Sequence, residues 1–341
     1  MRPVMLFLIG CLSLVGCSGG SDSTGDSQTP FTIRAFDPVS GSRWIGNAVS
    51  YGPHRDGQRP GGPDPSAAEI SQDLQLMLPH WNLLRVYSSR GPTETLLELI
   101  SRDGLDMKVM LGVWIAAEEK RDDTGAVLER FPENVTANQQ ELEKAIVLAE
   151  QYPDIIVAVC VGNETQVYWS AHRSPLDILI GHVRQIRARV SQPVTVADDY
   201  NFWNKPESRE LAAELDFITM HAHPMWNGKQ LDEALAWTAG QVQAIGEFHP
   251  DRLVVLGETG WATQVHDEGE QARLITGRFG EAEQKVFHDQ ARAWADSTRT
   301  VVFYFEAFDE NWKGGPHPDE VEKHWGVYRA DRTAKAALAG P

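Results

Sequence analysis

Apolar runs of strand length alternate with amphipathic stretches of helical period along most of this chain. The expected strands span residues 45–51, 83–87, 107–114, 155–161, 194–197, 217–221, 253–257 and 301–305. The expected helices span residues 66–78, 93–101, 139–151, 176–190, 207–215, 231–248 and 281–296. This alternation is typical of a (β/α)8 TIM barrel, and we predict one such α/β domain over residues 31–341. A doubly wound parallel sheet is the alternative, but Tyr51-Gly52-Pro53-His54 is not the glycine-rich turn that normally follows its first strand.

Polar or aromatic residues close nearly every expected strand. They are Tyr51, Arg85, Tyr87, Trp114, Asn163, Glu164, Asp198, Asp199, His221, His223, Glu258 and Glu306. In a TIM barrel the chemistry is carried out at the carboxyl ends of the strands. We therefore expect these side chains to surround one site at the mouth of the barrel.

Two of these residues form the candidate catalytic pair. Glu164 closes the fourth expected strand and Glu258 closes the seventh. A pair of carboxyl groups can hydrolyse a sugar acetal, because one protonates the leaving oxygen and the other attacks the sugar. The acid has to stay protonated near neutral pH, whereas the nucleophile has to stay ionised. Arg85 is placed to supply a positive charge, and Asn163 is placed to bind a sugar 2-hydroxyl.

Five segments resemble glycoside hydrolase family 17, in the order in which that family has them. The segments are Leu84-Arg85-Val86-Tyr87, Val161-Gly162-Asn163-Glu164, Gly257-Glu258-Thr259-Gly260-Trp261, residues 305–313 and His324-Trp325-Gly326-Val327-Tyr328. The resemblance implies a retaining enzyme for β-1,3-glucan, with Glu164 as acid/base and Glu258 as nucleophile. It also implies that Glu310, Lys313 and Glu322 form a supporting polar cluster. Residues 51–58 resemble the bacterial branch, which includes laminarin-degrading hydrolases and β-1,3-glucan glucanosyltransferases.

Aromatic residues at the strand ends are candidates for sugar contacts. Several tryptophans lie there or in the following loops: Trp114, Trp169, Trp203, Trp226, Trp261 and Trp312. The apolar faces of a pyranose ring stack on indoles. We choose Trp226 and Trp261, because each follows a candidate site strand within three residues, and add Tyr51, Tyr87 and His223 as substrate-binding or supporting residues.

A metal centre is the other interpretation of His221 and His223. Zinc hydrolases on this fold collect ligands from several strands, and the other expected strand ends carry no histidine. We therefore expect no metal and no cofactor, and assign these histidines to sugar hydrogen bonding or to packing.

The charge of the chain narrows the class of substrate. Asp and Glu number 48 against 31 Lys and Arg, which gives a formal net charge of −17. Such a field repels polyanions, so nucleic acids and acidic polysaccharides are poor partners. A neutral β-glucan polysaccharide or oligosaccharide is compatible with this charge, and we expect a monomer.

The N-terminus carries an export signal. An arginine precedes the apolar residues 4–15, and Leu14-Val15-Gly16-Cys17 resembles a bacterial lipobox with Cys17 as the lipidated residue. We predict a lipoprotein signal peptide over residues 1–16 and a flexible tether over residues 17–30, which is rich in Ser, Gly and Asp. Because Ser18 rather than aspartate follows the cysteine, the resemblance implies an exported protein anchored in the outer membrane by its lipid alone.

Three alternatives stay open at this point. The same two glutamates serve a glucanosyltransferase if a sugar hydroxyl replaces water as the acceptor. A related barrel enzyme for β-1,4-linked glycans normally has proline after the acid, whereas Thr165 follows Glu164 here. A non-catalytic glycan-binding lipoprotein would need aromatic residues but no paired acid and nucleophile.

Overall fold

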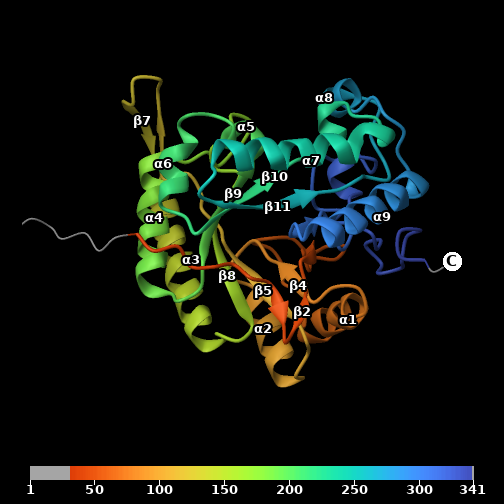
Figure 1. Cartoon of the computed structure of the whole chain (residues 1–341), viewed down its shortest axis with the longest axis horizontal. Coiled ribbons are helices and arrows are strands. Elements are labelled where there is room, and N and C mark those ends of the chain that lie inside the picture. The colour runs from red at the N-terminus through yellow and green to blue at the C-terminus, as the bar shows by residue number, and fades with distance from the viewer. Residues whose placement is uncertain (1–30, 340–341) are drawn as a thin grey trace, which may run out of the picture. The chain divides into compact units, whose positions relative to one another are not determined.

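Eight parallel strands close into a barrel in the computed structural model (Figure 1), which describes residues 31–339. Around the ring, the strands follow the order β10, β11, β12, β3, β4, β5, β8 and β9, and β9 pairs with β10 to complete it. The predicted signal peptide and tether lie outside the described residues. Within residues 31–339, no helix is both long and apolar enough to cross a membrane. The closed barrel confirms the (β/α)8 prediction and excludes the doubly wound sheet.

The strands of the barrel lie within two residues of their predicted starts and ends. They are β3 (Asn47–Ser50), β4 (Leu83–Arg85), β5 (Lys108–Val113), β8 (Ile156–Asn163), β9 (Val194–Asp199), β10 (Phe217–His221), β11 (Leu253–Thr259) and β12 (Val302–Tyr304). A short hairpin, β1 (Val39–Ser40) and β2 (Arg43–Trp44), precedes the barrel.

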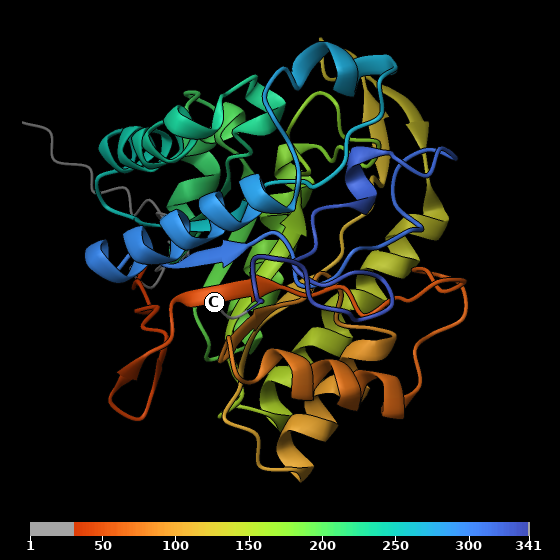
Figure 2. The same cartoon turned by 90° about the vertical axis from the view of Figure 1, so that its right-hand side faces the viewer.

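Helices connect successive strands and cover the outside of the barrel (Figures 1 and 2). They are α1 (Ala67–Met77), α2 (Pro92–Arg102), α3 (Pro132–Gln151), α4 (Leu176–Arg189), α5 (Tyr200–Trp203), α6 (Ser208–Ala213), α7 (Leu231–Phe248), α8 (Gly269–Leu274) and α9 (Glu281–Thr298), with 3-10 turns η1 (Met225–Asn227) and η2 (Val321–Lys323). The sequence marks the start of α1 clearly, because Ser66 and Glu69 form a reciprocal capping box.

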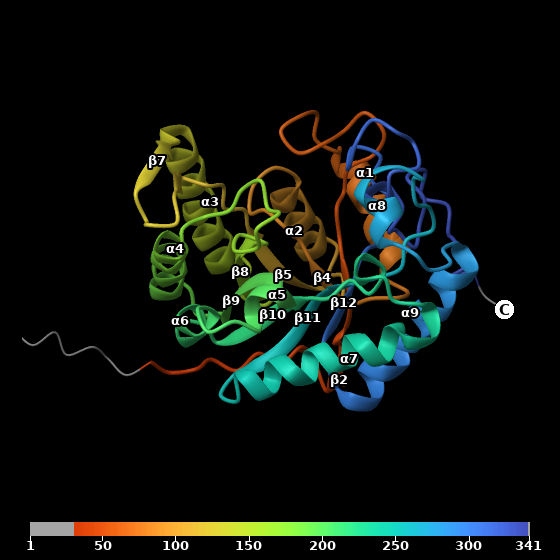
Figure 3. The same ribbon diagram turned by 90° about the horizontal axis from the view of Figure 1, so that it is seen from above.

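The connection between β5 and α3 differs most from the sequence prediction. It contains an unpredicted hairpin of β6 (Glu119–Arg121) and β7 (Val127–Arg130), which lies beside α3 and α4 (Figures 1 and 3). Helix α3 also begins seven residues before the predicted residue 139. Its early turns pack through polar contacts, since the Asn138 side chain accepts from the Ala116 N–H and donates to the Ala116 carbonyl. A search for apolar periodicity does not detect such contacts.

A small apolar cluster fills the inside of the barrel. The eight strands contribute Ala48, Leu83, Met110, Ala158, Cys160, Ala197, Phe217, Val255 and Phe303 to it. Phe36 closes its amino-terminal end by stacking on Phe217, with ring centroids 4.4 Å apart. Because strand residues alternate between faces, Arg85 points to the same inside as Leu83 but one layer higher. The barrel core therefore ends directly beneath the polar residues of its mouth.

A buried ion pair joins α1 to the C-terminal segment. The carboxylate of Asp73 accepts from Arg332 Nε at 2.9 Å and Nη2 at 2.8 Å, and from Arg55 Nη2 at 2.9 Å. The side chains of Asp73 and Arg332 are 0% and 2% exposed. Removal of one partner from a buried pair leaves the other charge without compensation.

We predict that Asp73→Ala lowers the free energy of unfolding by about 3–5 kcal/mol, because the Arg332 guanidinium stays buried and unpaired. Urea denaturation followed by circular dichroism measures the change. Asp103→Ala is the matched control, since Asp103 pairs with its neighbour Arg102 on the surface, and it should have little effect. Equal midpoints for the two variants would contradict the structural role of the buried pair.

Candidate active site

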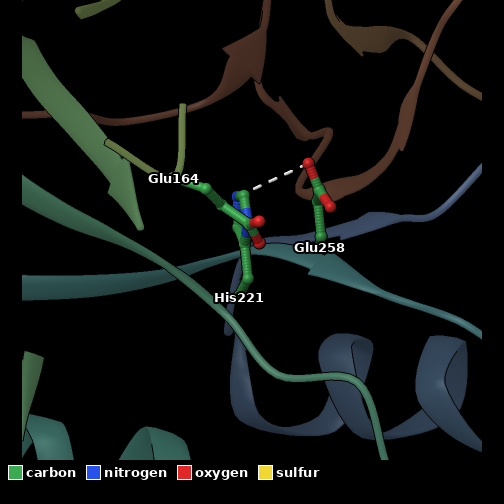
Figure 4. A group of neighbouring side chains, drawn as sticks. All are labelled: Glu164, His221 and Glu258. Carbon is green, nitrogen blue, oxygen red and sulfur yellow. Dashed lines mark hydrogen bonds and ion pairs between the residues drawn. The ribbon is translucent and has the colours of Figure 1, made fainter. Parts of the chain in front are cut away.

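The structure brings Glu164 and Glu258 together over the mouth of the barrel (Figure 4). One carboxylate oxygen of each residue and one ring nitrogen of His221 all lie within 4.8 Å of one another. Retaining glycosidases hold their two carboxyl groups about 5–5.5 Å apart, whereas inverting ones need about 6.5–9.5 Å to admit a water molecule. The observed spacing fits direct attack on the sugar by one of the two carboxylates.

Irregular backbone at the strand ends positions these side chains. The pairing register shifts between Cys160 and Asn163 in β8, and again between Met220 and His221 where β10 pairs with β11. Glu164 itself has φ of 48°, which a residue with a side chain rarely adopts. The Glu164 N–H donates to the carbonyl of Ala197 at 2.9 Å, so β9 helps to hold this conformation. Strained backbone of this kind costs about 1–3 kcal/mol and persists only where the surroundings impose it.

Arg85 connects three strands within the site. Its Nη1 lies 2.6 Å from Glu258 Oε1, and its Nη2 donates to Asn163 Oδ1 at 2.5 Å. The Tyr87 hydroxyl donates to the same Glu258 oxygen at 2.9 Å. The Arg85 side chain is 2% exposed, so this charge-assisted contact is made almost without water. Four of the predicted site residues, Glu258 included, are therefore joined in one hydrogen-bonded group through Arg85.

Two histidines of the β10 end complete the surroundings of the pair. His221 Nδ1 lies 2.9 Å from Glu164 Oε1, and its Nε2 lies 3.5 Å from Glu258 Oε1, as the dashed line in Figure 4 marks. His223 Nε2 lies 3.2 Å from Glu258 Oε2. His221 thus contacts both carboxylates, and His223 contacts only Glu258.

These contacts set the protonation state of Glu258. Burial raises the pKa of its carboxyl group, but the charges of His221 and Arg85 and the hydrogen bond from His223 outweigh burial and hold the pKa well below its usual value. The pKa of His223 is raised, because its hydrogen bond and attraction to Glu258 outweigh the opposing effect of burial. Glu258 is therefore ionised at neutral pH, as a nucleophile has to be.

A second charged cluster lies in the segment after β12. Lys313 Nζ donates to Glu306 at 2.8 Å and lies 2.8 Å from Glu310 Oε2. Burial acts against ionisation of Glu310, yet the Lys313 charge lowers its pKa to about 2. Glu322 joins this region from another direction, because the Trp226 indole N–H donates to Glu322 Oε1 at 3.2 Å. Of the predicted cluster, Lys313 and Glu310 form an ion pair, whereas Glu322 is hydrogen-bonded to Trp226 instead. Glu306, which was not predicted to belong to the cluster, pairs with Lys313 as well.

The structure does not place two of the predicted substrate-binding or supporting residues at the open mouth. Tyr51 is buried, and its hydroxyl donates to Asp73 at 3.1 Å, within the ion pair beneath α1. Trp261 is 0% exposed, and its indole N–H donates to the Arg278 carbonyl at 3.2 Å while its ring packs against Phe287. Proximity to a strand end does not specify which way a side chain points, and both of these rings point into the protein.

Glu306, Asp198 and Asp199 had no individual role in the sequence prediction, and His221 was assigned only to sugar hydrogen bonding or to packing. His221 and Glu306 stand at predicted strand ends, and that position was the signal available for them. Asp198 and Asp199 also end a strand beside Glu164, and the buried Asp198 accepts from the Gln166 N–H at 2.8 Å. Burial, with a smaller contribution from the Glu164 charge, raises the pKa of Asp199 to about 6.

The side chains of Glu164, His221 and Glu258 are also close enough to one another to bind a metal ion. Within the part of the chain that the structure describes, Glu164, His221 and Glu258 are the group of His, Cys, Asp or Glu side chains close enough to share an ion. Arg85 and Tyr87 already donate to Glu258 Oε1, however, and a guanidinium at 2.6 Å opposes the approach of a second cation. The donor set thus fits proton transfer and nucleophilic attack better than metal binding.

Comparison with known proteins places the chain in a family. Residues 48–326 match the BtgE/BtgC glycoside hydrolase domain, and the chain belongs to this family of glycoside hydrolases. A putative glucan endo-1,3-beta-glucosidase (btgC) of Aspergillus niger is 26% identical over 306 residues, which cover 81% of this chain and 40% of that protein. A glucan 1,3-beta-glucosidase of Schizosaccharomyces pombe is 27% identical over 280 residues, or 78% of this chain and 79% of that protein.

Two solved structures share the fold. An endo-laminarinase from Formosa Hel1_33_131 superposes with a TM-score of 0.73 at 24% identity, over 86% of both chains. A glycoside hydrolase family 17 β-1,3-glucanosyltransferase from Rhizomucor miehei gives a TM-score of 0.65 at 23% identity, over 86% of this chain and 96% of that one. The chain spans 40% of the length of the Aspergillus relative but most of the length of the others.

We predict that Glu258→Gln changes how stability depends on pH. The pKa of Glu258 is lower in the folded chain than its usual value of 4.5, so its ionisation stabilises the fold above pH 4.5 and this contribution is lost as the pH falls toward the folded pKa. Glutamine does not ionise, so the stability of the variant does not contain this pH-dependent contribution. The unfolding free energy of the native chain should therefore fall relative to the variant below pH 4.5. Urea titrations at a series of pH values measure the difference, and parallel curves would contradict the assignment.

Proposed function

We propose that this protein is a retaining glycosidase that cleaves β-1,3-glucosidic bonds in a neutral glucan. The observation that carries the proposal is that two carboxylates close to each other have different partners and different exposure to solvent. Arg85 lies 2.6 Å from Glu258, whereas Glu164 contacts His221 and is the more exposed, with 26% of its side chain accessible against 7%. One carboxylate is thus held ionised by a buried cation, and the other is open to solvent and to a leaving group.

The substrate class rests on relatives and on charge. The Aspergillus and Schizosaccharomyces proteins are named for β-1,3-glucan, and the two solved structures are named as a laminarinase and a β-1,3-glucanosyltransferase. A net charge of −17 disfavours acidic polysaccharides and leaves neutral glucans as the compatible class. Similarity to the bacterial branch of family 17 supports the same substrate.

The geometry suggests how the first step proceeds. Glu258 Oε1 accepts from Arg85 and Tyr87, so Oε2 is the freer oxygen to attack the anomeric carbon. As the bond from that carbon to the leaving oxygen breaks, Glu164 gives its proton to that oxygen. Arg85 donates to the side-chain oxygen Oδ1 of Asn163, which leaves the side-chain NH2 group of Asn163 to bind a sugar hydroxyl.

The second step releases the sugar from Glu258. Glu164, now ionised, takes a proton from the acceptor while the acceptor oxygen attacks the anomeric carbon and the ester bond to Glu258 breaks. Water as the acceptor gives hydrolysis. A sugar hydroxyl as the acceptor gives chain transfer, and the glucanosyltransferase among the structural neighbours makes this the second candidate.

Incubation of the purified chain with laminarin and with laminaripentaose tests this function. We expect shorter products, because the two carboxylates lie at the spacing of a retaining hydrolase. Products longer than pentaose establish transfer by the same pair. Binding without any change in chain length contradicts catalysis and supports a glycan-capturing protein.

Glu258→Ala is the variant that tests the roles within the pair. Loss of the nucleophile should lower kcat by on the order of 10⁴-fold or more. Added azide should restore part of the turnover and give a glycosyl azide of inverted configuration, because azide enters from the vacated face. Glu164→Ala is the matched control, where azide attacks the intact glycosyl enzyme and gives the retained configuration. Nuclear magnetic resonance of the two products distinguishes the anomers, and identical anomers would contradict the assignment.

We further propose that the chain is exported and anchored by a lipid on Cys17, as the lipobox resemblance implies. Cys17→Ser should abolish incorporation of labelled palmitate and release the protein from the membrane fraction of the expressing bacterium. Cys160→Ser is the matched control, since Cys160 is a buried free thiol within the barrel. Labelling that survives Cys17→Ser would contradict the anchor.

A further inference from the structure

Two aromatic side chains project into solvent from the loop that follows Glu164. Tyr168 is 82% exposed and Trp169 is 46% exposed, and their rings meet edge to face with centroids 4.9 Å apart. Exposed aromatic groups of this size cost hydration free energy, and adjacent pairs commonly mark binding surfaces. The proposed chemistry at Glu164 and Glu258 leaves both rings without a role.

The loop that carries them is fixed to the site on both sides. The Gln166 N–H donates to Asp198 in β9, and the His172 ring lies 2.7 Å from the carbonyl of Asn163. His172 also packs against Trp114 at the end of β5, with ring centroids 4.5 Å apart. The loop that carries the two exposed rings is therefore anchored near both of its ends to residues beside Glu164.

The position of this loop follows from the order of the strands. In the closed barrel, β8 and β12 are four strands apart in either direction, so their following loops stand on opposite walls of the mouth. Trp312, which follows β12 and is 40% exposed, is the aromatic residue of the other wall. A glucan that passes over the pair therefore meets exposed rings at both ends.

The direction of the reaction distinguishes the two walls. Glu164 protonates the leaving oxygen, so the departing sugar has to lie on the Glu164 side of the broken bond. Tyr168 and Trp169 come four and five residues after Glu164 in the same loop. The departing half of the substrate, and later the acceptor, thus lies toward these rings.

We infer that Tyr168 and Trp169 form a binding platform for the glucosyl residues on the leaving-group and acceptor side of the site. The inference rests on the proposed glucan-cleaving function and extends it. The ligand is a neutral β-glucan segment, since the apolar C–H face of each glucose can lie on an aromatic ring. A sugar held there also places its hydroxyl beside Glu164 in the second step, where water would otherwise enter.

The second step balances with either acceptor. The acceptor O–H gives its proton to the Glu164 carboxylate, its oxygen forms the new bond to the anomeric carbon, and Glu258 leaves as a carboxylate. The platform determines which acceptor is bound, but it takes no part in forming or breaking covalent bonds. It is therefore a determinant of substrate affinity and acceptor choice, and neither ring is a catalytic residue.

The test compares two donors on the full chain and on the Tyr168→Ala/Trp169→Ala double variant. Laminarihexaose needs a bound leaving sugar, whereas laminaribiosyl fluoride loses a fluoride ion that occupies no sugar-binding surface. The double variant removes both stacking faces for the leaving sugar, so we expect kcat/KM for the hexaose to fall at least about tenfold. Turnover of the fluoride should stay within about twofold, since it bypasses the platform.

The outcomes of this test distinguish failure of the platform from failure of the proposed function. Leu253→Ala removes an exposed apolar side chain at the start of β11, at the other end of the barrel, and should change neither donor. Unchanged hexaose cleavage in the double variant would overturn the platform, as would equal losses on both donors. A native chain inactive on both donors would instead contradict the proposed function itself.

Discussion

The contact between Arg85 and Glu258 is the constraint on which the rest of the site depends. A carboxylate that is 7% exposed would normally take up a proton, because the low-dielectric interior disfavours its charge. Arg85 opposes this with a guanidinium 2.6 Å away, and the guanidinium is itself buried. The two charges compensate each other, so neither can be removed without leaving the other isolated. The barrel thereby keeps an ionised nucleophile in a place that water barely reaches.

Arg85 also fixes the relative positions of two strand ends at the mouth of the barrel. It bonds a side chain of β11 and one of β8, the strands that carry Glu258 and Glu164. A planar guanidinium fixes the direction of both contacts, which a lysine in the same place would not do. The structure tolerates irregular backbone here, namely the bulges in β8 and β10 and the left-handed conformation of Glu164. The hydrogen bonds of Arg85 and the pairing of both strands with β9 hold this backbone in place. Local strain and the buried ion pair are therefore parts of one arrangement.

The sequence predicts the scaffold and the positions of Glu164 and Glu258 at its mouth better than the directions of individual side chains. Buried parallel strands read as continuous apolar runs, so β8 and β11 are visible, and the rule for barrel mouths places Glu164, Glu258 and Arg85. The same rule fails for Tyr51 and Trp261, because it locates a residue at the mouth without saying whether its ring faces the cavity or the core. The β6–β7 hairpin escapes detection because its polar strands bury little and rest on turn and ion-pair contacts. His221 shows the remaining limit, since a bridge between two carboxylates depends on a bulge that no spacing reveals.

The difference in exposure between the two carboxylates has a consequence for the choice of acceptor. Glu258 is enclosed by Arg85, Tyr87 and His223, whereas Glu164 is 26% exposed on the wall that carries the loop of Tyr168 and Trp169. In the proposed mechanism any acceptor gives its proton to Glu164, so we expect both water and sugar to reach the glycosyl enzyme over this wall. Water needs only access, but a sugar needs a surface that holds its ring long enough to compete with water at much higher concentration. We therefore expect the balance between hydrolysis and transfer to be set beside Glu164, by contacts that never touch Glu258.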